Sequence, residues 1–455
     1  MAQKLWQGAF AGATDDVIAF NSGENILLDA QLARYDILGS MAHVKMLAKQ
    51  KIINSEEASA IHCALKTILQ QHSSGSFTLD VKLEDVHTNV EAAVSKLTAH
   101  GKKMHTARSR NDQVLLDTRL CMRDQILSIS EAIMALQESF ASLAKNDGPM
   151  AAYTHTRVAQ PITVSFWADA YIQGLGRDIG RLMDAYARVN QNPLGAGAVA
   201  GSDWPIDRSY TAKLLAFDSV QSNALDAISS RGECEAECLC ALSLLMMRLS
   251  SLSEELIWLS QKGLIRIPDS FCTGSSMMPN KRNPDMLENV RGRTAGVYSD
   301  LMKVLIVKKG LMSGYHSDLQ ETKAALMDGF GVSSASVHIF SLLVPQLKFD
   351  AKAMRAELDS GYAQATQAAD ALALAGVPFR EAHGMVGRLV GECSKKGIPL
   401  SSAEPLPPLS KKQWADATSI ERPKLKLKPS ADGPWKAAVQ REKERIRKAY
   451  EQLEA

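Results

Sequence analysis

The stretch of the chain with the most chemical potential is residues 273–285, which read Thr-Gly-Ser-Ser-Met-Met-Pro-Asn-Lys-Arg-Asn-Pro-Asp. One glycine and two prolines exclude a continuous helix here, so the polar side chains must lie on a loop. Asn283 is a good N-cap and Pro284 suits a first turn, which predicts that a helix begins where the loop ends. A loop that brings Lys281 to a helix N-terminus favours an anion, although a plain solvent loop that caps a helix has a similar composition.

Two further segments carry polar groups suited to acidic substrates. Residues 105–114 (His-Thr-Ala-Arg-Ser-Arg-Asn-Asp-Gln-Val) offer two guanidinium groups, which match carboxylate geometry, although surface ion pairs at a helix start give the same pattern. Residues 153–162 (Tyr-Thr-His-Thr-Arg-Val-Ala-Gln-Pro-Ile) place His155 on a loop before a helix expected from Pro161. A histidine there can exchange protons near neutral pH or fill a structural role.

The ordered strings resemble those of the argininosuccinate lyases in the fumarase/aspartase superfamily. Residues 274–284 match the superfamily signature G-S-S-x-M-P-x-K-x-N-P, and residues 106–114 match T-G-R-S-R-N-D-Q-V with Ala107 in place of glycine. Residues 152–161 are similar to G-Y-T-H-x-Q-x-A-Q-P, and residues 315–323 to Y-x-x-D-x-Q-x-x-K. Shorter similar stretches, which extend the resemblance over nearly the whole chain, are residues 37–43, 85–87, 193–197 and 377–383.

The resemblance implies a reversible β-elimination that splits argininosuccinate into arginine and fumarate, the last step of arginine biosynthesis. Ser275 would be the base that removes the carbon-bound proton, and Lys281 would stabilise the negative charge that develops. His155 would be the acid/base partner at the leaving nitrogen, polarised by Glu288. The substrate contacts implied in the same way are Asn25, Ser109, Arg110, Asn111, Thr154, Asn283, Tyr315, Gln320 and Lys323. We expect the loop of residues 273–283 to close on the substrate.

Some positions depart from the family pattern. Asn25 stands where serine is frequent, and Gly232 stands where aspartate often follows the arginine; His316 and Thr322 also differ from commoner members. The alternatives are therefore another member of the superfamily, namely adenylosuccinate lyase, aspartase, fumarase or a succinyl-amine lyase. A catalytically silent structural relative, like those of the eye lens, is a further alternative.

Helices must position these segments, because the chain is rich in helix-forming residues between few breakers. Asn54 and Glu57 form a capping-box pattern, and the one strand candidate is Phe77–Leu83. The helices expected from apolar periodicity and breakers are Glu56–Gln70, Asp112–Ala144, Pro161–Val189, Glu233–Lys262, Pro284–Lys309, Gly329–Val344 and Lys436–Glu454.

These helices predict a mainly α protein with a long central bundle and smaller helical terminal domains. We expect an N-terminal domain over residues 1–106, a central bundle over residues 107–352 that carries the catalytic segments, and a C-terminal domain over residues 353–455. The resemblance further implies a homotetramer whose active sites are shared between subunits.

Composition narrows the class of protein. The 455 residues carry a net charge of +2, which removes the electrostatic argument for binding nucleic acid or a membrane surface. No apolar run approaches a membrane span, and residues 1–10 lack the apolar stretch of a secretion signal. The seven scattered cysteines fit no zinc pattern, so we expect a reduced, cytoplasmic protein with no metal, no organic cofactor and a small-molecule substrate.

Overall fold

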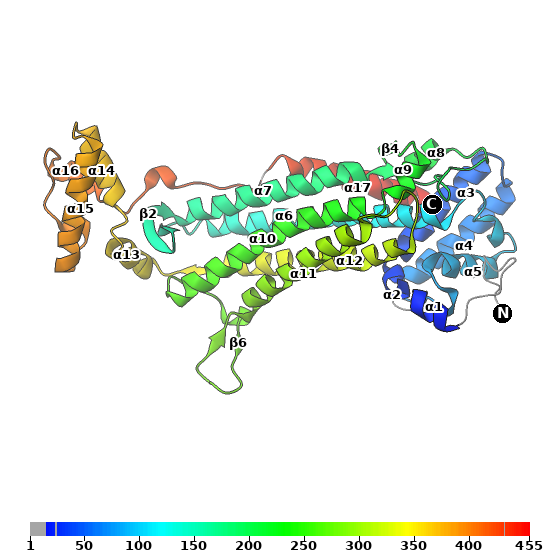
Figure 1. The fold of residues 1–455 in the computed structure, drawn as a ribbon, viewed down its shortest axis with the longest axis horizontal. Helices are drawn as coiled ribbons and strands as arrows, with labels where there is room; N and C mark the ends of the chain where they lie inside the picture. The colour runs from blue at the N-terminus through cyan, green and yellow to red at the C-terminus, as the bar shows by residue number, and fades with distance from the viewer. Residues whose placement is uncertain (1–14, 23–24, 432) are drawn as a thin grey trace.

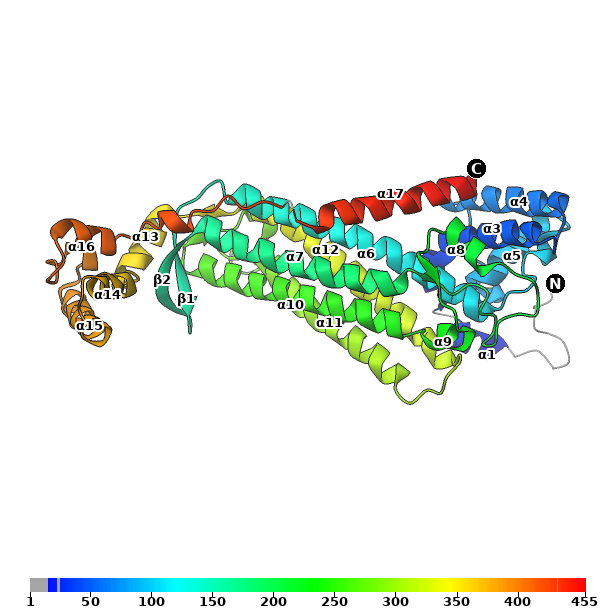
Figure 2. The ribbon, with the colours of Figure 1, turned by 90° about the horizontal axis from the view of Figure 1, so that it is seen from above.

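The computed structural model describes residues 15–455 apart from residues 23–24 and 432, so the segment tested for a secretion signal lies outside the described residues. Long helices run side by side along one axis and form the body of an elongated molecule (Figures 1 and 2). They are α6 (Arg110–Leu143), α7 (Val164–Val189), α10 (Glu233–Gln261), α11 (Asp285–Lys308) and α12 (Thr322–Leu343). The predicted mainly α bundle is confirmed.

Helix α6 is the central element of this bundle, and its start is set by a capping box. The Ser109 hydroxyl accepts from the backbone N–H of Asn111, while the backbone N–H of Ser109 donates to the Asp112 carboxylate. The helix has 34 residues and therefore spans about 51 Å. Buried side chains occur along its whole length, because α7, α12 and α3 all pack against it.

One end of the bundle carries the N-terminal helices together with short elements from the middle of the chain (Figure 1). The capping box of Asn54 and Glu57 opens α4 as predicted. The strand expected at Phe77–Leu83 is wrong: Val81–Leu83 form a 3-10 turn that the Asp80 carboxylate caps, which replaces strand pairing. The elements at this end are α1 (Asp15–Ser22), α2 (Asn25–Asp29), α3 (Ala33–Lys49), α4 (Ser55–Ser73), α5 (Val86–Leu97), β3 (Gln191–Asn192), α8 (Arg208–Leu214), β4 (Ser219–Val220) and α9 (Ala224–Ser229).

The opposite end carries a separate group of small helices, α13 (Ala351–Ser360), α14 (Ala365–Leu374), α15 (Phe379–Lys396) and α16 (Lys411–Ala417). Helices α14 to α16 enclose their own hydrophobic core, with Trp414 and Leu372 inside it. The last helix, α17 (Trp435–Glu454), returns along the bundle and buries Val439 and Ile446 in the main core. The division of the chain at residue 353 stays a prediction.

Short antiparallel strand pairs correct two of the predicted helix starts. Pro161 lies in β2 (Arg157–Thr163), which pairs with β1 (Pro149–Thr154), so the helix expected from Pro161 begins instead at Val164. The Thr163 hydroxyl caps that helix by accepting from the backbone N–H of Phe166. Asn283 is not an N-cap, because it pairs with Thr273 in the β6–β7 ladder. The remaining strands are β5 (Ile265–Arg266), β6 (Thr273–Gly274), β7 (Arg282–Asn283) and β8 (Lys348–Phe349).

Two segments, Glu233–Gln261 and Ser317–Gln346, are long and apolar enough to cross a membrane by length and composition alone. Both contribute to the centre of the bundle: Leu242 and Leu249 on the first and Phe330 and Phe340 on the second belong to the main core. Packing between helices therefore accounts for their apolar character.

Candidate active site

The predicted residues Ser109, Arg110 and Asn111 lie together at the start of α6. The Arg110 guanidinium donates to the Thr88 hydroxyl at 2.5 Å and lies 3.3 Å from the Asp85 carboxylate, so α5 holds it in place. The Asn111 amide donates to the backbone carbonyl of Ala198 at 3.2 Å. This end of α6 therefore presents a guanidinium, an amide and a helix N-terminus on one surface, a combination that binds anions.

Lys323 lies at the same end, in the first turn of α12. Its ammonium group is buried and forms an ion pair with the Asp29 carboxylate, with Nζ 2.5 Å from Oδ1. The other oxygen of Asp29 accepts from the backbone N–H of Val86. Because Asn25 and Asp29 belong to the same short helix, α2, this ion pair also brings Asn25 towards α12.

Tyr315 and Gln320 precede α12 and complete this first group. The Gln320 amide donates to the Tyr315 hydroxyl at 2.9 Å. Arg231, which sequence reasoning did not select, donates to the Gln320 carbonyl oxygen at 3.2 Å and lies over the Tyr315 ring. Its only sequence signal was its position directly before the atypical Gly232.

A second group of predicted residues lies next to the start of α11, on an arm that projects from the bundle (Figure 1). Strands β6 and β7 form the base of the arm, and Ser275 and Lys281 lie on the loop between them. The Ser275 hydroxyl oxygen accepts from the backbone N–H groups of Met277 at 3.3 Å and Met278 at 3.0 Å. Hydrogen bonds of this kind favour a negative charge on the oxygen, which is what a serine base requires.

His155 occupies the tip of the β1–β2 hairpin. Thr154 pairs with Arg157, so His155 and Thr156 form a two-residue turn, with φ of 52° and 58° respectively. Both residues therefore lie in the left-handed region that such hairpin turns require but that side chains other than glycine disfavour. The turn leaves the His155 side chain exposed.

The predicted residues thus lie in three places on one chain, namely the first group, the arm and the β1–β2 hairpin. Glu288 and Asn283 lie at the start of α11 with the arm, whereas Tyr315 follows its end. The 24 residues of α11 span about 36 Å, which separates the arm from the first group. Within the described part of this chain, no hydrogen bond joins His155 to Glu288 or either of them to Ser275. A single copy therefore does not assemble the predicted site.

A buried ion-pair network underlies the first group. The His87 Nδ1 lies 2.8 Å from the Asp36 carboxylate and 3.6 Å from that of Asp117, and these three side chains offer ligand atoms within 4.8 Å of one another. Burial alone lowers the pKa of His87, but the adjacent Asp36 carboxylate raises it above its usual value. Because Asp36 already engages the imidazole nitrogen, the geometry matches a charged histidine between two aspartates that ties α3, α5 and α6 together.

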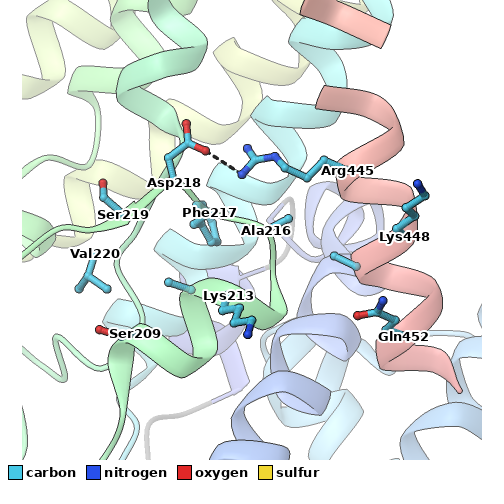
Figure 3. Close-up of a pocket in the computed structure, with 12 residues that line it drawn as sticks. Ser209, Lys213, Ala216, Phe217, Asp218, Ser219, Val220, Arg445, Lys448 and Gln452 are labelled. Atoms are coloured by element: carbon cyan, nitrogen blue, oxygen red, sulfur yellow. Dashed lines mark ion pairs between the residues drawn. The ribbon is translucent and has the colours of Figure 1, made fainter. Parts of the chain in front are cut away.

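One cavity lies away from both groups. It has a volume of about 500 Å³ and lies between α8, β4 and α17, as Figure 3 shows. Arg445 crosses it and forms a 2.7 Å ion pair with Asp218. None of the predicted site residues lines it, so this cavity is not the candidate active site.

Comparisons with known proteins decide the family. A family model described as Lyase matches residues 8–298, and one described as Argininosuccinate lyase C-terminal matches residues 362–418. The chain belongs to the argininosuccinate lyase family. A protein named argininosuccinate lyase from Geobacter metallireducens is 44% identical over 90% of this chain and 89% of its own, and one from Desulforamulus reducens is 41% identical over 99% of each. A crystal structure of EDDS lyase in complex with formate superposes with a TM-score of 0.75 at 26% identity, covering 97% of this chain and 92% of that one.

One departure from the argininosuccinate lyase pattern has a conformational consequence. Ala107 stands where the family string has glycine, and its φ is 61°, in the left-handed region. The chain therefore retains the backbone turn that glycine permits but places a side chain on it. The turn precedes Arg108, whose buried guanidinium donates to the Ser40 hydroxyl and so attaches the start of α6 to α3.

Proposed function

We propose that this chain catalyses the reversible β-elimination of argininosuccinate to arginine and fumarate, the last step of arginine biosynthesis. The observation that carries the proposal is the match of nearly the whole chain, at 41–44% identity, to proteins named argininosuccinate lyase. Retention of Ser275, His155 and Lys281 supports an active enzyme over a catalytically silent relative.

In the proposed mechanism Ser275 removes the proton from the carbon next to the succinyl carboxylate. The resulting intermediate carries an additional negative charge, so fixed positive charge and N–H donors must face it. Lys281, the amide of Asn283 and the N-terminus of α11 supply these groups, and the two backbone amides that contact Ser275 Oγ support its role as a base. Each lost donor of this type reduces turnover by about 10²–10³.

His155 is proposed as the acid/base partner that donates a proton to the leaving nitrogen, with Glu288 polarising its ring. The proposed substrate contacts are Asn25, Ser109, Arg110, Asn111, Thr154, Asn283, Tyr315, Gln320 and Lys323. Closure of the arm over the bound substrate would exclude water from the reaction, since a serine base is effective only in a dry pocket. The proposed chemistry requires neither a metal nor an organic cofactor.

We further propose a homotetramer in which each active site takes segments from three subunits: the first group, the arm and the β1–β2 hairpin. The separation of about 36 Å along α11 supports this arrangement, because one chain holds the first group and the arm apart. The exposed face of α11 supports it too: Tyr298, Met302, Leu305 and Ile306 are 41%, 52%, 47% and 56% exposed. Apolar side chains at this density on a helix are typical of an interface with another copy.

A cytoplasmic location is part of the proposal, supported by cysteines that are all free in the structure. The function is tested by following fumarate release from argininosuccinate, adenylosuccinate, aspartate and malate in parallel. We expect turnover of argininosuccinate alone. Turnover of adenylosuccinate alone would replace the proposed substrate, and no turnover of any of the four would favour a structural protein.

A further inference from the structure

Arg231 is a buried arginine that forms no ion pair with a carboxylate in the described part of the chain. It is 2% exposed and lies between α9 and α10, directly before Gly232. One guanidinium nitrogen, Nη2, donates to the Gln320 carbonyl oxygen at 3.2 Å, but Nε and Nη1 have no hydrogen-bond acceptor among the described residues. Leaving a buried guanidinium in this state costs stability. Arg108 is buried in the same state, so the contacts of Arg231 indicate its role, and its unpaired nitrogens alone do not.

The contacts of Arg231 lead to two of the proposed substrate-binding residues at once. The Gln320 amide that receives its hydrogen bond donates in turn to the Tyr315 hydroxyl at 2.9 Å. The Arg231 guanidinium also lies over the Tyr315 ring, 5.4 Å from its centroid. One buried side chain therefore fixes both the amide and the phenol.

The direction of these hydrogen bonds determines what Tyr315 can offer to a ligand. The guanidinium can only donate, so the Gln320 carbonyl oxygen must face Arg231 and its NH₂ group must face Tyr315. The Tyr315 oxygen is then an acceptor in this contact, which leaves its hydroxyl proton free to donate elsewhere. A phenol oriented in this way is a ready donor for a carboxylate.

The residues next to Arg231 carry charges of both signs, because the buried Glu235 carboxylate accepts from the backbone N–H of Gly232 at 2.9 Å. Gly232 brings no side chain to neutralise the guanidinium, and its φ of 89° is one that other residues adopt only with strain. The Lys308 side chain fills the adjacent space, with its Cδ 3.5 Å from the position that a Cβ of residue 232 would take. The Lys308 ammonium group itself donates to the backbone carbonyl of Ser229.

We propose that Arg231 is a positioning residue for substrate binding. It holds the Gln320 amide in one orientation, so that Tyr315 presents its hydroxyl proton to a carboxylate of the substrate. This inference rests on the proposed function, in which Tyr315 and Gln320 contact argininosuccinate. Without Arg231 the Gln320 amide can rotate and accept the Tyr315 proton itself, which withdraws that donor from the substrate.

Loss of Arg231 should affect substrate binding more than bond cleavage, because the contact of the Tyr315 hydroxyl with the substrate carboxylate exists in both the ground state and the transition state. A contact of this kind changes KM while kcat stays nearly constant. The test therefore measures fumarate release from argininosuccinate by the full-length protein, for Arg231→Met, Tyr315→Phe and the double variant. We expect each single variant to raise KM about tenfold, with kcat within about twofold of the unchanged protein.

The double variant decides whether Arg231 acts through Tyr315. If it does, Arg231→Met adds nothing once the hydroxyl is gone, so the double variant should have the same KM as Tyr315→Phe. The proposal would be overturned if the fold-increase in KM of the double variant equalled the product of the fold-increases of the two single variants. An Arg231→Met enzyme with an unchanged KM, or one in which only kcat falls, would overturn it too.

Lysine variants of two buried arginines, Arg231 and Arg123, distinguish a role in positioning the substrate from a role in folding. Arg123 is also fully buried, but its guanidinium bonds to the backbone carbonyls of Leu215 and Ala216. We expect Arg123→Lys to lower the melting temperature without changing KM, and Arg231→Lys, which loses the planar fork, to raise KM at least threefold. An equal KM in the two lysine variants would overturn the proposal even if Arg231→Met does not fold. Failure of the unsubstituted enzyme to turn over argininosuccinate would instead reject the proposed function itself.

Discussion

Lys323 and Asp29 are joined by a buried ion pair that connects the first turn of α12 to the last residue of α2. Their sequence separation is 294 residues, yet both side chains are only 4% exposed. The pair links a short N-terminal helix, which carries Asn25, to the main bundle. The first group of site residues therefore depends on a charge interaction as well as on apolar packing.

Asp29→Asn tests this dependence, because it leaves the Lys323 ammonium buried without its charge partner. Removal of one member of a buried ion pair costs about 3–5 kcal/mol in the free energy of unfolding. Urea denaturation at fixed protein concentration would measure the loss. The exposed pair of Lys303 and Glu321 provides the control, since Glu321→Gln should cost less than about 1 kcal/mol. Equal losses in the two variants would contradict the assignment.

Mixed subunits test the sharing of active sites. Ser275→Ala removes a residue of the second group, on the arm, and Asn111→Ala removes one of the first group, at the start of α6. Each variant alone should reduce kcat by about 10²–10³ while leaving the fold intact. When the two variants are refolded together, some sites receive both unsubstituted segments from different chains. Fumarate release should then rise well above that of either parent. A mixture no more active than its parents would argue that each chain builds its own site.

Ala107→Gly should stabilise the protein. Alanine pays a steric cost in the left-handed region that glycine avoids, so we expect a gain of about 1 kcal/mol in the free energy of unfolding. Ala135 lies on the exposed face of α6 in ordinary helical geometry, and Ala135→Gly should lose about 1 kcal/mol. The urea midpoint should therefore rise in Ala107→Gly and fall in Ala135→Gly. A fall in both variants would contradict the prediction.

Stability should decline in mild acid because of His43. Burial, with the nearby charge of Arg108, lowers its pKa to about 3, and one ring nitrogen contacts the Thr106 carbonyl at 2.8 Å. Below the ordinary histidine pKa of 6.5 the unfolded chain binds a proton that the folded state does not, so stability falls as pH falls. The slope reaches about 1.4 kcal/mol per pH unit for one group.

His43→Gln should reduce this slope between pH 7 and pH 5, as measured from urea denaturation at each pH. His105, whose pKa burial also lowers to about 3, would keep its own contribution. His383 is solvent-exposed, and His383→Gln should follow the unsubstituted protein. The same slope in His43→Gln as in the parent would assign the acid sensitivity to other groups.

The long helices could be predicted because each buries an apolar face that repeats at helical spacing. The start of α7 could not, because Pro161 suits a first helical turn and the edge of a strand equally well. Pairing of Pro161 with Ala151 in β1, which the helical pattern of residues 161–189 does not reveal, decided between the two. Likewise Asn283 has a side chain suited to an N-cap, but its backbone pairs with Thr273 in the β6–β7 ladder.

The motifs identified the groups that carry chemistry but not the residues that hold them. Asp85 was part of a matching stretch, yet its contact with Arg110 follows from the packing of α5 against the start of α6. Asp29 belongs to no motif that we identified, and Arg231 preceded an atypical glycine without any sign of its contacts. Partners that are distant in sequence meet only through tertiary packing, which periodicity does not encode.

The length of α11 has a genetic consequence under the proposed sharing of sites. A defect at one end of a subunit disables a different catalytic centre from a defect at the other end. Two inactive alleles with lesions at opposite ends of this helix should therefore rescue each other in one cell. Two alleles with lesions at the same end should not, so pairwise crosses would sort harmful substitutions into two classes.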